Sequence, residues 1–268
     1  MTATIPTRTQ AERADLTRAR ILEAAIVQFS ENGLAGARTE QIAEEAGVNK
    51  ALLYYYFRSK ELLYTASLET VAERLAANSL QVLILKASAG ERMLRAALNH
   101  FDRIYSEPVF QKLMQQEMIR LRSGDSKVGS PLVEKLFRPL GSKTLAVIQE
   151  GIGTGELIPA DPSQMIYAAL GPNVFYFLSA PMMRLIGEVN PFDRGTLEFR
   201  RRVAIEYLGQ ALFIDREHGA RAAAKVLAAT PMPITIKAPV AVTAQARSAK
   251  NKPVANQIAE ARQNERKK

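Results

Sequence analysis

Basic and tyrosine side chains recur on one side of a short predicted helix that begins near residue 50. Positions three, four and seven apart share a side of an α-helix, and this spacing relates Lys50, Ala51, Tyr54, Tyr55 and Arg58. Lysine, arginine and tyrosine all hydrogen-bond to phosphate oxygens. A helix with only a structural role would instead carry mixed Glu and Lys on its solvent side. The pattern therefore favours a surface that binds nucleic acid.

The opposite side of this helix is apolar, and another short helix precedes it. Inward packing is expected for Val48, Leu53 and Phe57. We expect the preceding helix to begin with Thr39 as its N-cap, because a threonine oxygen can accept a bond from a free amide of the first turn. Gly47 can take the left-handed conformation that ends that helix, and Asn49 can cap the next one. Two short helices separated by so few residues predict a helix-turn-helix.

Alternative chemistries find little support in the sequence. The chain has no cysteine, which excludes disulfides, thiolate catalysis and cysteine-based zinc sites. Its two histidines, His100 and His218, are far apart, and no Ser-His-Asp set, HExxH or Walker sequence is present. The glycines of residues 151–155 lack a preceding strand and are interpreted as a helix end rather than a phosphate cradle. We therefore expect neither an enzyme nor a cofactor or metal site.

Most of the net positive charge is concentrated near the C-terminal end. The net charge of +9 either favours a polyanionic partner or only aids solubility. Residues 231–268 contain eight basic and two acidic residues, which accounts for two thirds of that net charge. We expect residues 230–268 to be a disordered basic tail, either simply solvated or a non-specific DNA anchor. Residues 1–15 are expected to form a flexible arm that is disordered or touches DNA.

The remaining residues have the apolar spacing of helices, and no convincing strand or repeat is found, so the predicted fold class is all-α. A kink is expected near Pro139. Helices are predicted over residues 17–31, 60–86, 90–105, 108–122, 130–151, 161–186 and 193–218. The N-terminus lacks a signal peptide's apolar core, and no uncharged apolar stretch reaches the roughly 18 residues of a membrane span. We therefore expect a cytoplasmic protein without a membrane partner.

Three motifs lie within residues 17–63: ILEAA followed by F and G, then T-x-x-I-A-x-x-A-G-V, then L-Y-x-Y-F-x-S-K-E-x-L. Together they resemble the DNA-binding region of the tetracycline-repressor-type (TetR) family of transcriptional regulators. The resemblance implies a helix-turn-helix DNA-binding domain over residues 16–62. It also implies a larger helical domain over residues 63–229 that binds a small molecule and dimerises. Most members of the family are repressors that a ligand releases from DNA.

The resemblance implies phosphate contacts from both ends of the helix-turn-helix. Thr39 would hydrogen-bond a phosphate at the start of its helix, where the amide dipole favours an anion, and an N-cap role is compatible with this contact. Tyr54 and Tyr55 would reach phosphates and also a base or thymine methyl. Lys60 would hold a phosphate from the first turn of the following helix.

Base reading is implied for the start of the recognition helix. Lys50 could donate to guanine O6 and N7, while Ala51 and Leu52 offer only apolar contact that suits a thymine methyl. Leu52 could equally pack into the core. Because this repertoire is small, readout of DNA shape is expected to contribute.

In the family the last two long helices form the dimer, and here these are residues 161–186 and 193–218. A twofold dimer would place the recognition helices about 34–36 Å apart and predicts a nearly palindromic operator. The effector is expected among the helices of residues 60–186, where methionines and aromatic residues suit an apolar or amphipathic ligand. The candidate ligand-binding residues, each of which could also be ordinary core, are His100, Tyr105, Met114, Met118, Asn173, Tyr176 and Phe177.

The leading hypothesis is a homodimeric, ligand-responsive transcriptional regulator, most often a repressor, that binds double-stranded DNA. One rival is a DNA-associated structural or cell-organisation protein that uses the same module without a small ligand. A second rival is a helical enzyme or carrier.

Overall fold

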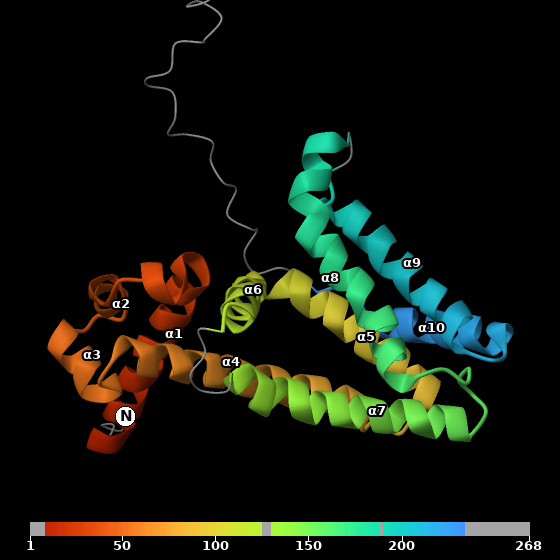
Figure 1. The fold of residues 1–268 in the computed structure, drawn as a ribbon, viewed down its shortest axis with the longest axis horizontal. Helices are drawn as coiled ribbons and strands as arrows, with labels where there is room; N and C mark the ends of the chain where they lie inside the picture. Colours follow the sequence, from red (N-terminus) through yellow and green to blue (C-terminus); the bar gives the residue numbers. More distant parts are fainter. Residues whose placement is uncertain (1–8, 125–129, 188–189, 234–268) are drawn as a thin grey trace, which may run out of the picture. The chain divides into compact units, whose positions relative to one another are not determined.

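A computed structural model describes residues 9–124, 130–187 and 190–233, which form helices joined by short connections (Figure 1). Within these residues the β pairing is limited to one isolated bridge, and the all-α prediction is confirmed. None of the helices found there combines the length and apolar content needed to cross a membrane. The elements are α1 (Gln10–Gly36), α2 (Thr39–Glu45), α3 (Lys50–Phe57), α4 (Lys60–Leu83), α5 (Ala89–Ser106), α6 (Pro108–Arg122), η1 (Val133–Phe137), α7 (Arg138–Gly153), α8 (Pro162–Ile186), α9 (Arg194–Leu212) and α10 (Arg216–Ala229).

Helices α1, α2 and α3 pack together at one end of α4, and we call these three helices (residues 10–57) the reading head (Figure 1). Its core residues with no exposed surface include Ile21, Phe29, Ile42 and Leu53. The same core continues along α4 through Leu63 and Leu68, and α6 contributes Leu113. The orientation of the reading head on α4 is therefore held by apolar contacts from α4 and α6.

Helix α1 begins earlier than predicted. Thr9 caps it through a capping box with Glu12, so residues 10–15, which were expected to belong to a flexible arm, are helical. Residues 1–8 of that arm lie outside the described residues. Near its other end the helix is interrupted at Gly33, where φ is +66°, close to the predicted helix end. A Cβ at this position would approach the Gln116 amide oxygen of α6 to 2.6 Å, so the glutamine side chain would have to shift to admit one.

A second core lies away from the reading head, among α5, α7, α8, α9 and α10. Helices α4 and α7 run alongside each other (Figure 1) and connect the two cores. Before α7, the π-helix η1 widens the backbone just ahead of Pro139, which has no amide proton and would crowd a regular helix. The helix is therefore irregular at the place where the kink was predicted.

The helix predicted over residues 193–218 is wrong in its C-terminal part, because α9 ends at Leu212 and α10 begins at Arg216. Phe213 is pulled out of the helix by its bridge to Leu157. Asp215 then caps α10 by accepting from two backbone amides of its first turn.

Helix α10 packs back on α9 where Gly209 and Gly219 meet, since a Cβ on Gly219 would lie 1.8 Å from the Gly209 carbonyl oxygen. Of the predicted tail over residues 230–268, residues 234–268 lie outside the described residues.

Candidate nucleic-acid interface

The turn between α2 and α3 is built by Gly47 and Asn49, as predicted. Gly47 has a φ of +65°, a conformation that glycine adopts without Cβ strain. The backbone amide of Val48 donates to the Ala43 carbonyl at 2.9 Å and closes the end of α2. The Asn49 side chain accepts from the Leu52 amide at 2.8 Å and caps α3. These local bonds fix the start of α3 relative to α2.

Helix α3 has two sides of different chemistry, and the predicted division is confirmed except at Tyr54, which was expected on the outward side but is half-buried against the core of the reading head. Leu53 and Phe57 are buried in the core of the reading head. The exposed residues at this helix are Lys50, Ala51, Leu52, Tyr55 and Arg58. Tyr55 is 79% exposed and Leu52 is 36% exposed, so neither is a core residue. The solvent side of α3 therefore combines cations, a tyrosine and small apolar surface.

Thr39 occupies a different place from the one predicted. Arg38, not Thr39, is the N-cap of α2, and it makes no side-chain capping bond, so the N-cap prediction is wrong. Thr39 is buried, and its Oγ1 shares a hydrogen bond of 3.2 Å with the Tyr54 hydroxyl. The threonine side chain turns toward α3 because this partner lies there. The pair ties α2 to α3 and brings two predicted DNA-binding side chains together.

Both predicted lysines have partners within the chain. Lys50 Nζ donates to Glu40 Oε1 at 2.5 Å, and this bond lowers the pKa of the Glu40 carboxyl and raises the pKa of Lys50. Lys60 Nζ donates to the Ala35 carbonyl at 3.1 Å. The Lys50 and Glu40 side chains are both about half exposed. A phosphate or base could therefore replace these partners with little loss from desolvation.

Sequence reasoning missed two features of this surface, the contact made by Glu40 and the backbone conformation of Arg58. Glu40, the partner of Lys50, lies ten positions away on another helix, and no local spacing indicates that contact. Arg58 has a φ of +58°, the one positive φ at a non-glycine residue in the described part of the chain. This could have been foreseen, because α3 ends at Phe57 and Ser59 caps α4, so one residue makes the whole turn.

The candidate ligand-binding residues do not all gather in one place. Tyr105, Tyr176 and Phe177 pack around Phe101, with ring centroids of Phe101 and Phe177 5.1 Å apart. Met114 instead packs against the core of the reading head, and Met118 is 59% exposed on α6.

Asn173 of α8 is buried, and His100 of α5 is partly buried. The Asn173 side chain donates to the Ala97 carbonyl of α5 at 3.1 Å. His100 Nδ1 is buried and has no hydrogen-bond partner among the described residues. Burial lowers the pKa of His100 to about 4, so its imidazole is neutral near pH 7.

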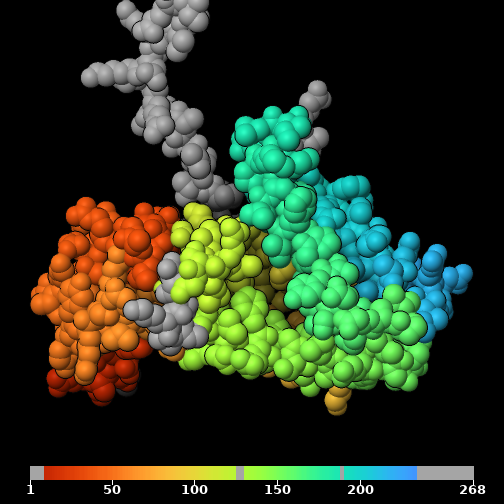
Figure 2. Space-filling model, in the orientation of Figure 1, coloured from red at the N-terminus to blue at the C-terminus, as the bar shows by residue number. Residues whose placement is uncertain are grey.

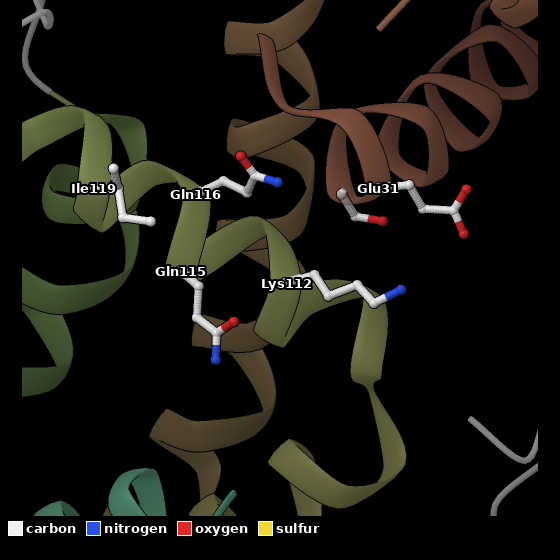
Figure 3. A pocket seen from close by; sticks show the side chains of 6 residues that line it. Glu31, Lys112, Gln115, Gln116 and Ile119 are labelled. Atoms are coloured by element: carbon white, nitrogen blue, oxygen red, sulfur yellow. The ribbon is translucent and has the colours of Figure 1, made fainter. Parts of the chain in front are cut away.

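A polar surface hollow of about 440 Å³ lies between α1 and α6 (Figure 3). Ser30 and Glu31 of α1 line one side, and the α6 residues lining the other are Lys112, Gln115, Gln116 and Ile119. None of the seven predicted ligand residues lines it. Its position makes it part of the contact between α6 and the reading head, where Gln116 meets Gly33.

Comparison with known proteins agrees with this geometry. Residues 21–67 match the family model described as bacterial regulatory proteins, tetR family. The HTH-type transcriptional regulator RutR of Escherichia coli is 31% identical over 199 residues, which cover 69% of this chain and 87% of RutR. The HTH-type transcriptional repressor NicS of Pseudomonas putida is 47% identical over 62 residues, or 23% of this chain and 29% of NicS.

Solved structures of transcriptional regulators have a similar fold. The transcriptional regulator FadR from Bacillus subtilis, solved in complex with stearoyl-CoA, aligns with a TM-score of 0.53 at 20% identity over 71% of this chain and 96% of FadR. The helix-turn-helix of the reading head, the all-α fold and the extended match to RutR agree with one another. The chain belongs to the tetR family of bacterial regulatory proteins.

Proposed function

We propose that this chain is a homodimeric repressor that binds a nearly palindromic DNA operator and is released by a small apolar or amphipathic effector. The proposal assigns it no catalytic role and places it in the cytoplasm, where its DNA partner would lie. The observation that carries the proposal is the outer side of α3, where exposed cations and tyrosine stand on a helix anchored by Leu53 and Phe57. A surface of this kind fits the major groove of DNA.

Proposed DNA contacts follow from the positions of the side chains. Lys50, Ala51 and Leu52 occupy the first turn of α3 and are assigned to base edges. Tyr55 is assigned to the phosphate backbone together with Lys60, and the hydroxyls of Thr39 and Tyr54 would share one phosphate. Lys50 would exchange Glu40 for a base, and Lys60 would exchange the Ala35 carbonyl for a phosphate.

Support for a homodimer comes from the outer side of α8. Arg184 is its one charged residue, although large side chains along the helix are exposed. These exposed residues, at largely helical spacing, are Tyr167, Val174, Phe175, Leu178, Met182, Met183, Leu185 and Ile186. Helix α8 forms part of the visible surface in Figure 2, and on α9 Phe199 and Tyr207 are exposed as well. An apolar surface of this extent favours burial against a second copy of the chain.

Support for an effector of apolar character comes from the aromatic cluster between α5, α8 and α9. FadR, of similar fold, was solved with stearoyl-CoA, a ligand with a long apolar chain. In this chain Phe101, Tyr176 and Phe177 form a cluster that also contacts Leu197 of α9. We infer that the effector binds beside these rings, where it would bear on both helices assigned to the dimer. NicS is named a repressor, which favours repression over activation here.

The test is binding of the full chain to the DNA upstream of its own gene and to random DNA of equal length, at about 150 mM salt. We expect a preference for the upstream DNA of at least about 10³-fold. We also expect a footprint of one short palindrome and a protein dimer by light scattering. Equal affinity for both DNAs would refute the regulator. Scattered footprints with no palindrome would support the rival DNA-organising role instead.

A further inference from the structure

We propose that Arg58 is a further contact to the DNA backbone, held in place by the strained turn between α3 and α4. The inference rests on the proposed DNA-binding function and assigns a specific contact to a residue that the sequence pattern placed on the exposed side of α3 without a role of its own. The backbone conformation of Arg58 is one that arginine rarely adopts. Arg58 has φ +58° and ψ −42°, a region that side chains disfavour and glycine tolerates.

The turn itself explains the conformation. The Arg58 amide donates to the Tyr54 carbonyl at 2.8 Å as the last bond of α3. The Ser59 amide donates to the Phe57 carbonyl at 2.6 Å, which closes a three-residue γ-turn centred on Arg58. The Ser59 hydroxyl then caps α4 by accepting from the Leu62 amide at 3.1 Å. These bonds fix the end of α3 and the start of α4, so the backbone changes direction at Arg58 alone.

Stability of the fold would favour glycine at such a position, because glycine lacks the Cβ that causes the strain. No polar interaction of the Arg58 side chain within the described residues offsets this strain. It is exposed, and the guanidinium has no hydrogen bond or ion pair with any residue that the structure describes. A strained residue whose side chain points to solvent from a binding surface is a candidate for function rather than folding.

Three nearby cations differ from Arg58 in this respect. Lys50 is paired with Glu40, Lys60 donates to Ala35, and the Arg18 guanidinium lies 5.1 Å from the centre of the Phe57 ring. Arg58 lies two residues before Lys60 and at the end of α3 opposite to the base-reading Lys50. The first turn of a recognition helix faces the bases, whereas its far end lies near the sugar-phosphate backbone. The chemistry that Arg58 would recognise is therefore a phosphate of the DNA backbone.

Two variants separate this role from a role in folding. Arg58→Gln keeps a side chain and the backbone strain but removes the charge, and Arg58→Gly removes both. Lys143→Gln, at an exposed lysine of α7, is the matched control for loss of one positive charge. Each protein is titrated with operator and with random DNA at several salt concentrations, and its melting temperature is measured.

We expect Arg58→Gln and Arg58→Gly to weaken binding to both DNAs alike, by roughly 4-fold for each phosphate that is no longer neutralised. The slope of log affinity against log salt should fall by about 0.9 per phosphate, and Lys143→Gln should change neither. Arg58→Gly should also raise Tm by about 2–4 °C, since the strain is relieved. The glycine variant would thus be more stable and yet bind more weakly.

Wild-type affinity and salt slope in Arg58→Gln would overturn the inference while leaving the regulator intact, provided that wild-type protein prefers the operator. A lower Tm in Arg58→Gln with unchanged DNA binding would assign Arg58 to the helix terminus instead. If wild-type protein shows no preference for its upstream DNA, the proposed function itself fails and the inference fails with it.

Discussion

The outer sides of α3 and α8 are both exposed, yet their chemistry differs. On α3 the exposed side chains include Lys50, Tyr55 and the adjoining Arg58, which water hydrates well. On α8 they are apolar, and Phe175 and Leu185 are 67% and 88% exposed. Single exposed apolar residues are common, but a row of them along one helix is not. The α3 side can remain in water between binding events, whereas the α8 side is expected to be covered permanently.

The two surfaces therefore predict different kinds of partner. Attraction to phosphates weakens as salt rises, because binding releases counterions from the DNA. Burial of apolar surface does not weaken in this way. Assembly of the protein and its affinity for DNA should consequently be separable, both by salt and by substitutions confined to one of the two helices.

The largest effect is expected from a charge placed in the α8 surface. Phe175→Asp should yield a monomer, because an unpaired carboxylate would be buried in the proposed dimer contact. Binding to the palindromic operator should fall by about 10²–10⁴-fold, since the two half-sites would no longer be bound by one linked particle. Light scattering and operator titration measure the two outcomes.

Ile84→Asp, at a 55% exposed residue just after α4, is the control that should leave both unchanged. A dimeric Phe175→Asp protein would contradict the assignment of this surface.

Acid should weaken the packing of the helices beyond the reading head, because both histidines lie outside residues 10–57. Burial lowers the pKa of His100 to about 4, from about 6.5 in the unfolded chain. The unfolded chain binds the proton more readily, so the stability due to neutral His100 is complete above about pH 6.5. It is lost as pH falls from about 6.5 to about 4, by at most about 3 kcal/mol.

His100→Leu should therefore reduce the difference in unfolding free energy between about pH 7.5 and about pH 4.5, as urea titration can measure. His218→Gln, at the second histidine, which is about half exposed, is the control. If His100→Leu and wild-type protein lose the same stability in acid, His100 does not remain neutral in the folded chain.

The reading head was the part of the fold most open to prediction. The Gly47 turn, the Asn49 cap and the buried Leu53 and Phe57 all depend on residues within a few positions of one another. Short-range bonds of this kind leave a pattern in the sequence. Thr39 failed as an N-cap because its hydroxyl bonds to Tyr54, fifteen positions away, and such a contact leaves no periodic pattern.

The helices beyond the reading head were less predictable because their arrangement depends on contacts between distant segments. The break between α9 and α10 is set by Leu157, far from Phe213 in sequence, and the apolar spacing continues across it. Met114 and Met118 were grouped with Tyr176 by residue type, but α6 places them toward the reading head or solvent. Residue type indicates what could bind a ligand, whereas only packing determines which residues meet.

Substitutions of Tyr54 test whether the exposed side of α3 faces DNA. Tyr54→Ala should weaken operator binding about 10-fold while the protein stays folded, because it removes a proposed phosphate donor and its bond to Thr39. Tyr54→Phe keeps the half-buried ring and should show the part of that loss due to the hydroxyl. Operator titration and circular dichroism are the measurements. Normal operator binding by both variants would mean that this side of α3 does not face DNA.

The smallest effect is expected at Glu40, whose carboxylate would compete with DNA for Lys50, the proposed base-reading residue. Glu40→Gln would release Lys50 and remove a negative charge close to the proposed DNA phosphates. Binding to random DNA should rise about 3-fold, the range expected for one exposed ion pair. Operator binding should rise less, because the freed lysine is no longer directed toward one base.

Glu44→Gln, at an exposed residue of the same helix, provides the matched control. Comparing the ratio of operator to random affinity in the two variants separates a general charge effect from a change in selectivity. A ratio that falls only in Glu40→Gln would mean that the Glu40–Lys50 pair helps to select the base. Equal ratios would mean that Glu40 acts only as a surface charge. The selectivity of α3 would then depend on Ala51, Leu52 and DNA shape.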